Sequence, residues 1–240
     1  MSTLLGIIQT FAKRTGIPVP TQVIGSSDTQ IVQLEGLLEE ILEDLCTRWT
    51  WQALIYEAHF TSVAAEVQGT LSVIAPNGYL RILKDTIYNR TMRLPIYGPM
   101  TEANWQVAKS MFNAGPLYRY RLRGNQLLTY PQMPVGHECY FEYASSRAVL
   151  DYGGAVFKQF PTDDGDTFLF QDHILLAGLR WKWKCEKGLD YSEELRRFEE
   201  MVADANAQDN RKPDLSMTSG SGNAVPGIMV PLGIWPVSNS

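Results

Sequence analysis

Few side chains in this sequence have the type and spacing that metal binding requires. His137 and Cys139 lie two residues apart in a stretch that alternates like a strand, so both could point to one side and bind zinc. A zinc site needs three or four ligands, whereas this pair is only the closest pairing of His and Cys along the chain. We therefore favour the simpler interpretation, in which both are strand residues packed near a core.

A second candidate is the acidic loop formed by Asp163, Asp164 and Asp166 around Gly165, which bears a faint likeness to a calcium-binding loop. It lacks the alternating ligands and the closing glutamate of an EF-hand, and this favours a solvated turn. The chain also has no G-x-S-x-G, G-x-x-x-x-G-K-[ST] or C-x-x-C motif, although a triad of distant residues would leave no such mark. We predict that the protein is not an enzyme and needs no metal or cofactor.

Basic side chains share one face of a predicted strand. Arg119, Arg121 and Arg123 alternate with Tyr118, Tyr120 and Leu122. Because alternate residues of a strand point to the same side, the three arginines form a stripe. This stripe is either a surface for docking or for DNA, or the polar side of a half-buried sheet, and we favour the second interpretation.

Helical periodicity at both ends of the chain indicates which elements position these residues. Apolar residues recur every three or four positions within 4–15, 28–46, 172–187 and 191–208. None of these helices can bury its apolar stripe alone, so helices from the two ends of the chain must pack together. We predict that they form one four-helix bundle.

The middle of the chain has the composition of strands and turns. From Ile55 to about Tyr143 it is rich in Tyr, Thr, Val and Phe, with frequent Gly and Pro. A hairpin is expected to turn at Gly124 and Asn125, and one short helix to begin at Thr101. The predicted class is α+β: a bundle of N- and C-terminal helices, an inserted β-rich domain and an extended C-terminal arm. The expected divisions are 1–54 and 169–209 for the bundle, 55–168 for the insert and 210–240 for the arm.

Composition limits the class of protein further. The 240 residues are 45% hydrophobic and carry a formal net charge of -5, whereas a protein that grips DNA phosphates normally has a basic excess. No stretch approaches the roughly 20 apolar residues of a membrane span, and the first residues do not resemble a signal peptide. Three widely separated cysteines suit a reducing compartment. We expect neither a membrane partner nor specific DNA binding.

Four segments, taken in order, resemble one known family. They are RWTWQAL, DTIYNRTMRLPIYGPMT, YRYRLRGNQLLTYP and LRWKWKCEKGLDYSEELRRFEEMVADA. Together they are similar to the head-to-tail adaptor (connector) proteins of short-tailed bacteriophages, of the tail tubular protein A type. The resemblance runs from about residue 4 to 209 and rests on the order of the segments more than on any invariant motif.

The resemblance implies a structural virion protein at the portal–tail junction, assembled in the host cytoplasm. In that family a helical bundle with an inserted β domain forms a twelve-fold ring that connects the portal to the tail nozzle. The implied partners are the portal protein, the nozzle protein, further copies of the chain, and double-stranded DNA that passes through the lumen without specific binding. The acidic balance suits such a conduit, because a wall of lysines would hold the DNA. Two alternatives remain open: a phage-associated hydrolase, or a generic protein–protein adaptor.

Within such a ring, charged helix faces are the expected contacts between neighbouring subunits. The second predicted helix has an acidic run between positions 39 and 44, which is either a solvated face or a subunit contact. We expect an isolated chain to be monomeric and the portal to act as a template for the ring. The candidate contact residues are Glu39, Glu43, Arg196 and Arg197.

The last residues, NAVPGIMVPLGIWPVSNS, are apolar and uncharged. Prolines at three positions rule out a regular helix, so this segment cannot bury its apolar residues by itself. It is either a disordered end without a partner or a segment that a neighbour orders, and we favour the second. The resemblance assigns it to the portal. The candidate portal-binding residues are Ile228, Met229, Val230, Ile234 and Trp235.

Overall fold

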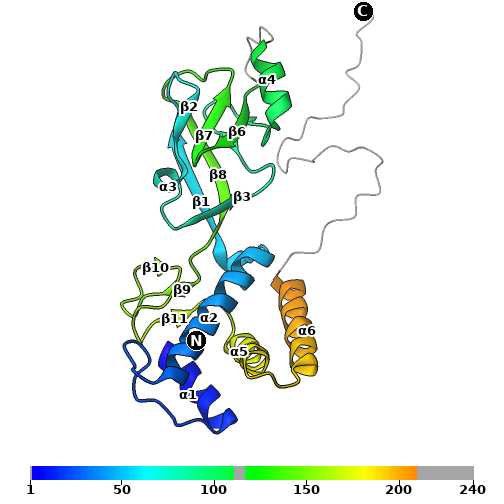
Figure 1. The fold of residues 1–240 in the computed structure, drawn as a ribbon. Coiled ribbons are helices and arrows are strands. Elements are labelled where there is room, and N and C mark those ends of the chain that lie inside the picture. The colour runs from blue at the N-terminus through cyan, green and yellow to red at the C-terminus, as the bar shows by residue number, and fades with distance from the viewer. Residues whose placement is uncertain (1, 111–116, 210–240) are drawn as a thin grey trace, which may run out of the picture. The chain divides into compact units, whose positions relative to one another are not determined.

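A computed structural model of the protein describes residues 2–110 and 117–209 (Figure 1). The helices of this part are α1 (Leu4–Thr15), α2 (Thr29–Arg48), α3 (Leu71–Ile74), α4 (Glu102–Ser110), α5 (Asp172–Glu186) and α6 (Ser192–Asp209). The strands are β1 (Ile55–Thr61), β2 (Val67–Thr70), β3 (Tyr79–Ile82), β4 (Tyr88–Asn89), β5 (Leu94–Pro95), β6 (Arg119–Arg123), β7 (Gln126–Tyr130), β8 (Glu138–Ser145), β9 (Val149–Leu150), β10 (Phe157–Lys158) and β11 (Thr167–Phe168). Two helices therefore precede a β-rich middle and two long helices follow it, which confirms the predicted α+β class.

Side-chain caps mark the starts of the first two helices, and a glycine marks the end of the first. The Thr3 hydroxyl accepts a hydrogen bond from the Gly6 N–H, and Gly16 ends α1 in the left-handed conformation, with φ 75°. At the start of α2 the Asp28 carboxylate accepts a hydrogen bond from the Gln30 N–H at 2.9 Å. These caps satisfy backbone groups that no helical hydrogen bond reaches, so they fix the ends of both helices.

The long helices from the two ends of the chain share one hydrophobic core. Its largest fully buried side chains include Phe11 of α1, Leu34 of α2 and Phe198 of α6. The main helix–helix contacts all involve α5, which packs against α1, α2 and α6. In Figure 1, α5 is seen almost end-on, whereas α2 and α6 run across the view.

The predicted four-helix bundle is therefore wrong, although the helices do pack together. The other three helices contact α5 from different directions instead of aligning about one axis. A small antiparallel sheet, in the order β10-β9-β11, also contributes Val149 and Phe168 to the same core. Part of the apolar surface that the prediction assigned to helix–helix contact is thus covered by strands.

The β-rich middle has two antiparallel sheets and its own core. One has the order β1-β8-β4-β5, with β3 also paired to β8, and the other has the order β2-β7-β6. Strand β1 pairs with β8 along its whole length, from Ile55 opposite Ala144 to Thr61 opposite Glu138. The β6–β7 hairpin turns at Gly124 and Asn125, as predicted, with φ 56° and 60°.

The second core gathers aromatic side chains from several strands and loops. Tyr120, Phe141 and Tyr143 are fully buried there. Arg81 of β3 links this part to the end of α2, since its guanidinium donates hydrogen bonds to the Thr47 carbonyl at 3.1 Å and to the Thr50 hydroxyl at 2.8 Å. Every helix in the described parts of the chain is too short or too polar to cross a bilayer.

Candidate functional site: an arginine-lined groove

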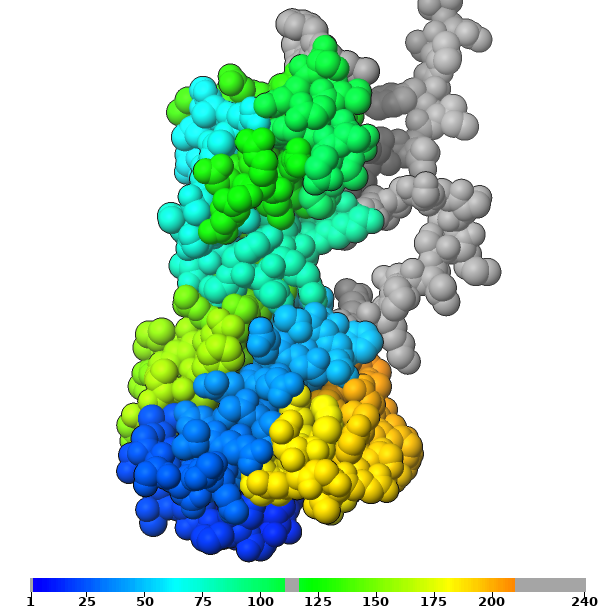
Figure 2. All heavy atoms as spheres, viewed as in Figure 1, coloured from blue at the N-terminus to red at the C-terminus, as the bar shows by residue number. Residues whose placement is uncertain are grey.

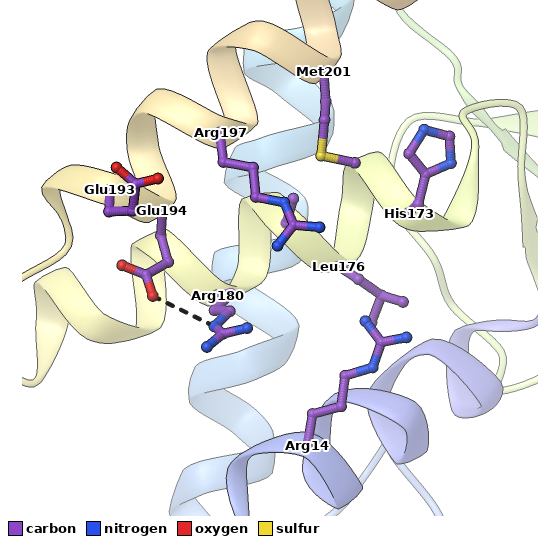
Figure 3. A pocket seen from close by; sticks show the side chains of 9 residues that line it. Arg14, His173, Leu176, Arg180, Glu193, Glu194, Arg197 and Met201 are labelled. Carbon is purple, nitrogen blue, oxygen red and sulfur yellow. Dashed lines mark ion pairs between the residues drawn. The ribbon is translucent and has the colours of Figure 1, made fainter.

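A groove of about 210 Å³ lies between α1, α5 and α6 (Figure 3). Figure 2 shows α5 in yellow and α6 in orange adjoining on the surface of the helical part. The side chains that line the groove are Arg14 of α1, then His173, Leu176, Ala177 and Arg180 of α5, and Glu193, Glu194, Arg197 and Met201 of α6.

Apolar side chains make the floor of this groove and guanidinium groups make its rim. Leu176, Ala177 and Met201 are half-buried, whereas Arg14 and Arg197 are exposed. In Figure 3, Arg14 extends from α1 and Arg197 from α6 toward the side chains of α5 between them. The groove therefore combines an apolar surface with cationic groups on both sides.

The positive charges of the groove are only partly neutralised by its own glutamates. Arg180 Nε lies 3.6 Å from Glu194 Oε1, and Lys184 also forms an ion pair with Glu194. Arg14 and Arg197 form no ion pair with any residue in 2–110 or 117–209. Arg197 acts on Glu193 only through its charge, so both guanidinium groups can still bind a carboxylate or another anion at this surface.

The two arginines predicted as subunit contacts have different surroundings. Arg197 lines the groove, but Arg196 points into a cluster of carboxylates on its own helix. Its guanidinium lies 2.6 Å from Glu193 Oε1 and 2.5 Å from Glu200 Oε1. Arg196 is therefore already neutralised within α6, which leaves Arg197 as the better candidate for a contact with another molecule.

The two glutamates predicted as subunit contacts belong to a stripe on α2. Glu35, Glu39 and Glu43 are spaced by four residues, so they lie along one flank of the helix. None of them forms an ion pair with another described residue, in contrast to Glu40, whose Oε1 lies 2.5 Å from Lys182 Nζ. We call these three residues the acidic stripe.

The protein environment of Glu35 and Glu39 in the acidic stripe disfavours their charge. Partial burial raises the pKa of the Glu35 carboxyl, and repulsion from Glu39 and Asp164 raises it further. Partial burial also raises the pKa of Glu39. A cation brought to this stripe would relieve an unfavourable arrangement that the single chain leaves uncompensated.

The residues considered for zinc have other partners. His137 Nδ1 lies 3.0 Å from the Asn89 side-chain nitrogen, and Cys139 is fully buried in the core of the β-rich middle. Burial, together with the nearby Glu138, raises the pKa of the Cys139 thiol to about 12, so this sulfur stays protonated at neutral pH. Within residues 2–110 and 117–209, no three His, Cys, Asp or Glu side chains are grouped as metal ligands would be.

The carboxylates of the acidic loop bind backbone N–H groups of neighbouring segments, so the loop is not a solvated turn. The Asp166 side chain is 0% exposed and accepts hydrogen bonds from the N–H groups of Tyr152, Thr162 and Asp163, at 3.0, 2.8 and 3.1 Å. Lys158 Nζ lies 3.2 Å from its Oδ2. The prediction of a solvated turn is therefore wrong for Asp166, because its oxygens are occupied by backbone amides and an ammonium group.

A second carboxylate of the same loop holds the segment that precedes α2. The Asp164 side chain accepts hydrogen bonds from the N–H groups of Val23 and Ile24, at distances down to 2.8 Å. These contacts join residues that lie about 140 positions apart in the sequence. The loop thus ties the N-terminal segment to the small sheet of the helical part.

The arginine stripe of β6 lies mostly on the polar side of its sheet. Arg119 and Arg123 are exposed. Arg121 is only 11% exposed in its side chain, and its guanidinium lies 3.2 Å from Glu102 of α4. The favoured interpretation therefore fits Arg119 and Arg123, while Arg121 has a structural partner. The predicted portal-binding residues, from Ile228 to Trp235, lie outside the described residues.

The groove itself could not be recognised in the sequence, because its residues come from three helices. No pattern in the sequence singles out Arg14 or Arg180. No family model matches the chain, and no curated protein matches it in sequence. The groove and the acidic stripe must therefore be interpreted from their own chemistry.

Proposed function

We propose that the protein is a head-to-tail adaptor, a structural component of a bacteriophage virion at the portal–tail junction. In this role copies of the chain form a ring, twelve-fold by the resemblance, that connects the portal protein to the tail nozzle protein. Double-stranded DNA passes through the ring during ejection without specific binding. The protein acts through its surfaces in virus assembly and catalyses no reaction.

The observation that supports this proposal most is the way the chain is divided between two cores. Helices from both ends of the chain share one core, and the β-rich middle has another. The order of segments that resembles the adaptor family implies a similar division, with helices from both ends and an inserted β domain, although the strands β9 and β11 of the predicted insert pack on the core of the helices. The net charge of -5 also suits a conduit from which DNA must be released.

A direct test mixes the purified full-length chain with the portal protein of the same phage. We expect the chain alone to scatter light as a monomer, and the mixture to contain a complex enlarged by a ring of copies. Negative-stain images of that complex should show added density at one end of the portal. The portal alone and the chain alone are the controls.

Two results would contradict the proposed function. A mixture in which the two proteins stay separate, under conditions where tails assemble, would contradict the adaptor role. Hydrolysis of host envelope material by the purified chain would favour the alternative of a phage-associated hydrolase.

A further inference from the structure

We propose that the acidic stripe of one copy of the chain binds in the arginine-lined groove of the next copy. This inference rests on the proposed function, since it names the surfaces through which the copies of a ring would meet. It commits to one occupant of the groove, a second copy of this chain. The reasons are the charges of the two surfaces and their positions on the helices.

The groove offers what a row of carboxylates needs. Arg14 and Arg197 stand on opposite helices and form no ion pair with a described residue, although the charge of Arg197 also acts on Glu193. Arg180 shares its glutamate with a lysine. Bidentate hydrogen bonds between guanidinium and carboxylate are among the stronger polar contacts in proteins. The half-buried apolar floor adds surface that a helix flank could cover.

The acidic stripe has the matching properties. Its three carboxylates repeat every four residues, which corresponds to a rise of about 6 Å between neighbours along the helix. On the same flank Val32 is 50% exposed, and Gly36 has open space where a side chain would project. A partner could therefore approach the helix backbone closely and cover apolar surface while its cations reach the carboxylates.

The two surfaces lie on different sides of the helical part, so a chain cannot satisfy its own stripe. The flank of α2 that faces α5 and α6 is marked by the ion pairs Glu40–Lys182 and Arg48–Glu199. The flank that carries the stripe also carries Val32 and Gly36, which are both exposed, so the stripe faces away from those contacts. Two different complementary patches on one chain join copies head to tail, which is the geometry that rings require.

Other anions are the alternative occupants of the groove. The carboxylates of Glu193 and Glu194 beside Arg180 repel any anion, the acidic stripe included, so we expect an anion to bind at Arg14 and Arg197. Inorganic phosphate could still occupy the space between Arg14 and Arg197. Phosphate binding without contact between copies is therefore treated as an outcome that would overturn the inference.

The first experiment is disulfide cross-linking between copies. Cys46 and Cys139 are buried and are left in place. The exposed Cys185 is changed to serine, so that the native cysteines form no cross-link. Glu39→Cys and Arg197→Cys are then combined in one chain, which is oxidised both alone at high concentration and in the presence of the portal. We expect a ladder of dimers, trimers and larger species on a non-reducing gel. The control pairs Arg197→Cys with Glu57→Cys, on the exposed side of β1, and should give no ladder.

The second experiment exchanges the charges of the two surfaces. Arg14→Glu with Arg197→Glu reverses the groove, and Glu39→Arg with Glu43→Arg reverses the stripe. We expect the dissociation constant between copies of each double variant to be at least ten-fold higher than that of the parent. Analytical sedimentation with and without the portal measures it. An equimolar mixture of the two variants should recover association, because each reversed surface then meets a complementary one. Arg196→Gln, outside the groove, is the control and should associate like the parent.

The outcomes separate this inference from the proposed function. If the parent assembles on the portal but the ladder is absent and the mixture recovers nothing, the surfaces are wrong and the adaptor role stands. If the ladder forms but the portal is not bound, the surfaces are right and the adaptor role fails. A thermal shift with inorganic phosphate that depends on Arg14 and Arg197, without a ladder, would identify the groove as an anion site and overturn the inference.

Discussion

Cγ2 of Ile41 in α2 lies 3.0 Å from the position that a Cβ atom would take on Gly178 in α5. Cε2 of Phe198 in α6 lies 3.2 Å from the same position. Three helices therefore meet at a point of α5 where any Cβ atom would crowd Ile41 and Phe198. This contact explains how α5 can be approached closely by α2 and α6 at once.

The first prediction concerns that contact. Gly178→Val should lower the free energy of unfolding by about 1–3 kcal/mol, because the added methyl groups overpack the junction of the three helices. Urea unfolding of the isolated chain measures the effect. Gly36→Ala in α2 is the matched control: its side chain would meet nothing within 4 Å, and removing a helix glycine should stabilise by about 0.5–1 kcal/mol. A Gly178→Val variant as stable as the parent would show that the close contact does not exist.

The second prediction concerns the buried carboxylate of Asp166. Asp166→Asn should lower the free energy of unfolding at pH 7 by about 2–4 kcal/mol, since it removes a charge paired with Lys158 and turns an amide group toward backbone N–H donors. Asp163→Asn is the control, because Asp163 is exposed and an amide oxygen can still accept from the Gly165 N–H. That control should stay within about 0.5 kcal/mol of the parent.

The stability difference for Asp166 should also depend on pH with a definite sign. Desolvation alone would raise the pKa of Asp166, but hydrogen bonds from Thr162 and other donors hold it below the ordinary value of 3.8. The folded state then binds fewer protons than the unfolded state, so the stabilisation is fully present above the ordinary pKa and is lost as pH falls through the folded pKa. The gap between Asp166→Asn and the parent should shrink below about pH 4. A gap that stays constant from pH 7 to pH 3 would refute this account.

The third prediction concerns the acidic stripe in the isolated chain. Glu39→Gln should raise the free energy of unfolding at pH 7 by up to about 0.5 kcal/mol, because a neutral amide avoids the cost of a partly buried charge beside Glu35. Because the pKa of Glu39 is raised in the folded state, lowering the pH protonates Glu39 and removes the cost of its charge from the parent. The difference in stability between Glu39→Gln and the parent should therefore disappear as the pH falls below about 4.5. Glu40→Gln, which breaks the ion pair with the buried Lys182, should show no gain.

The fourth prediction concerns the C-terminal arm. Under the proposed function, truncation after Lys212 and the variant Trp235→Ala should both weaken portal binding, with Trp235→Ala costing about 2 kcal/mol or more if it is a hot spot. Isothermal titration against the portal measures both, and urea unfolding confirms that the variants fold. Two folded variants that bind the portal as tightly as the full chain would remove the arm from the interface.

Much of the local structure could be predicted, because it depends on neighbours in the sequence. The repeat of apolar residues over 4–15 predicted α1, and the pair Gly124–Asn125 predicted the β6–β7 turn. The arrangement of the helices could not be predicted in the same way. Periodicity shows which face of a helix is apolar, but it does not show what covers that face or at which angle.

The site was predicted in part for the same reason. Glu39 and Glu43 share a helix, so their common flank followed from the spacing alone. Arg14 and Arg197 meet across a groove although 183 residues separate them, and no local pattern could join them. Likewise, the role of Asp166 depends on the N–H of Tyr152 in another segment, so the loop alone suggested only a turn.

The shared core of the helical part also fixes the order in which the chain can fold during synthesis. Leu45 of α2 belongs to the same core as Ile174 of α5, and about 130 residues separate them. At roughly 5–20 residues per second, a ribosome needs on the order of 6–26 s to make the residues between them. The β-rich middle is synthesised before α5, so it can fold first. The apolar faces of α1 and α2 stay exposed until α5 has been synthesised. A chain arrested near residue 150 should therefore bind chaperones through its first 50 residues, and release them once α5 has emerged.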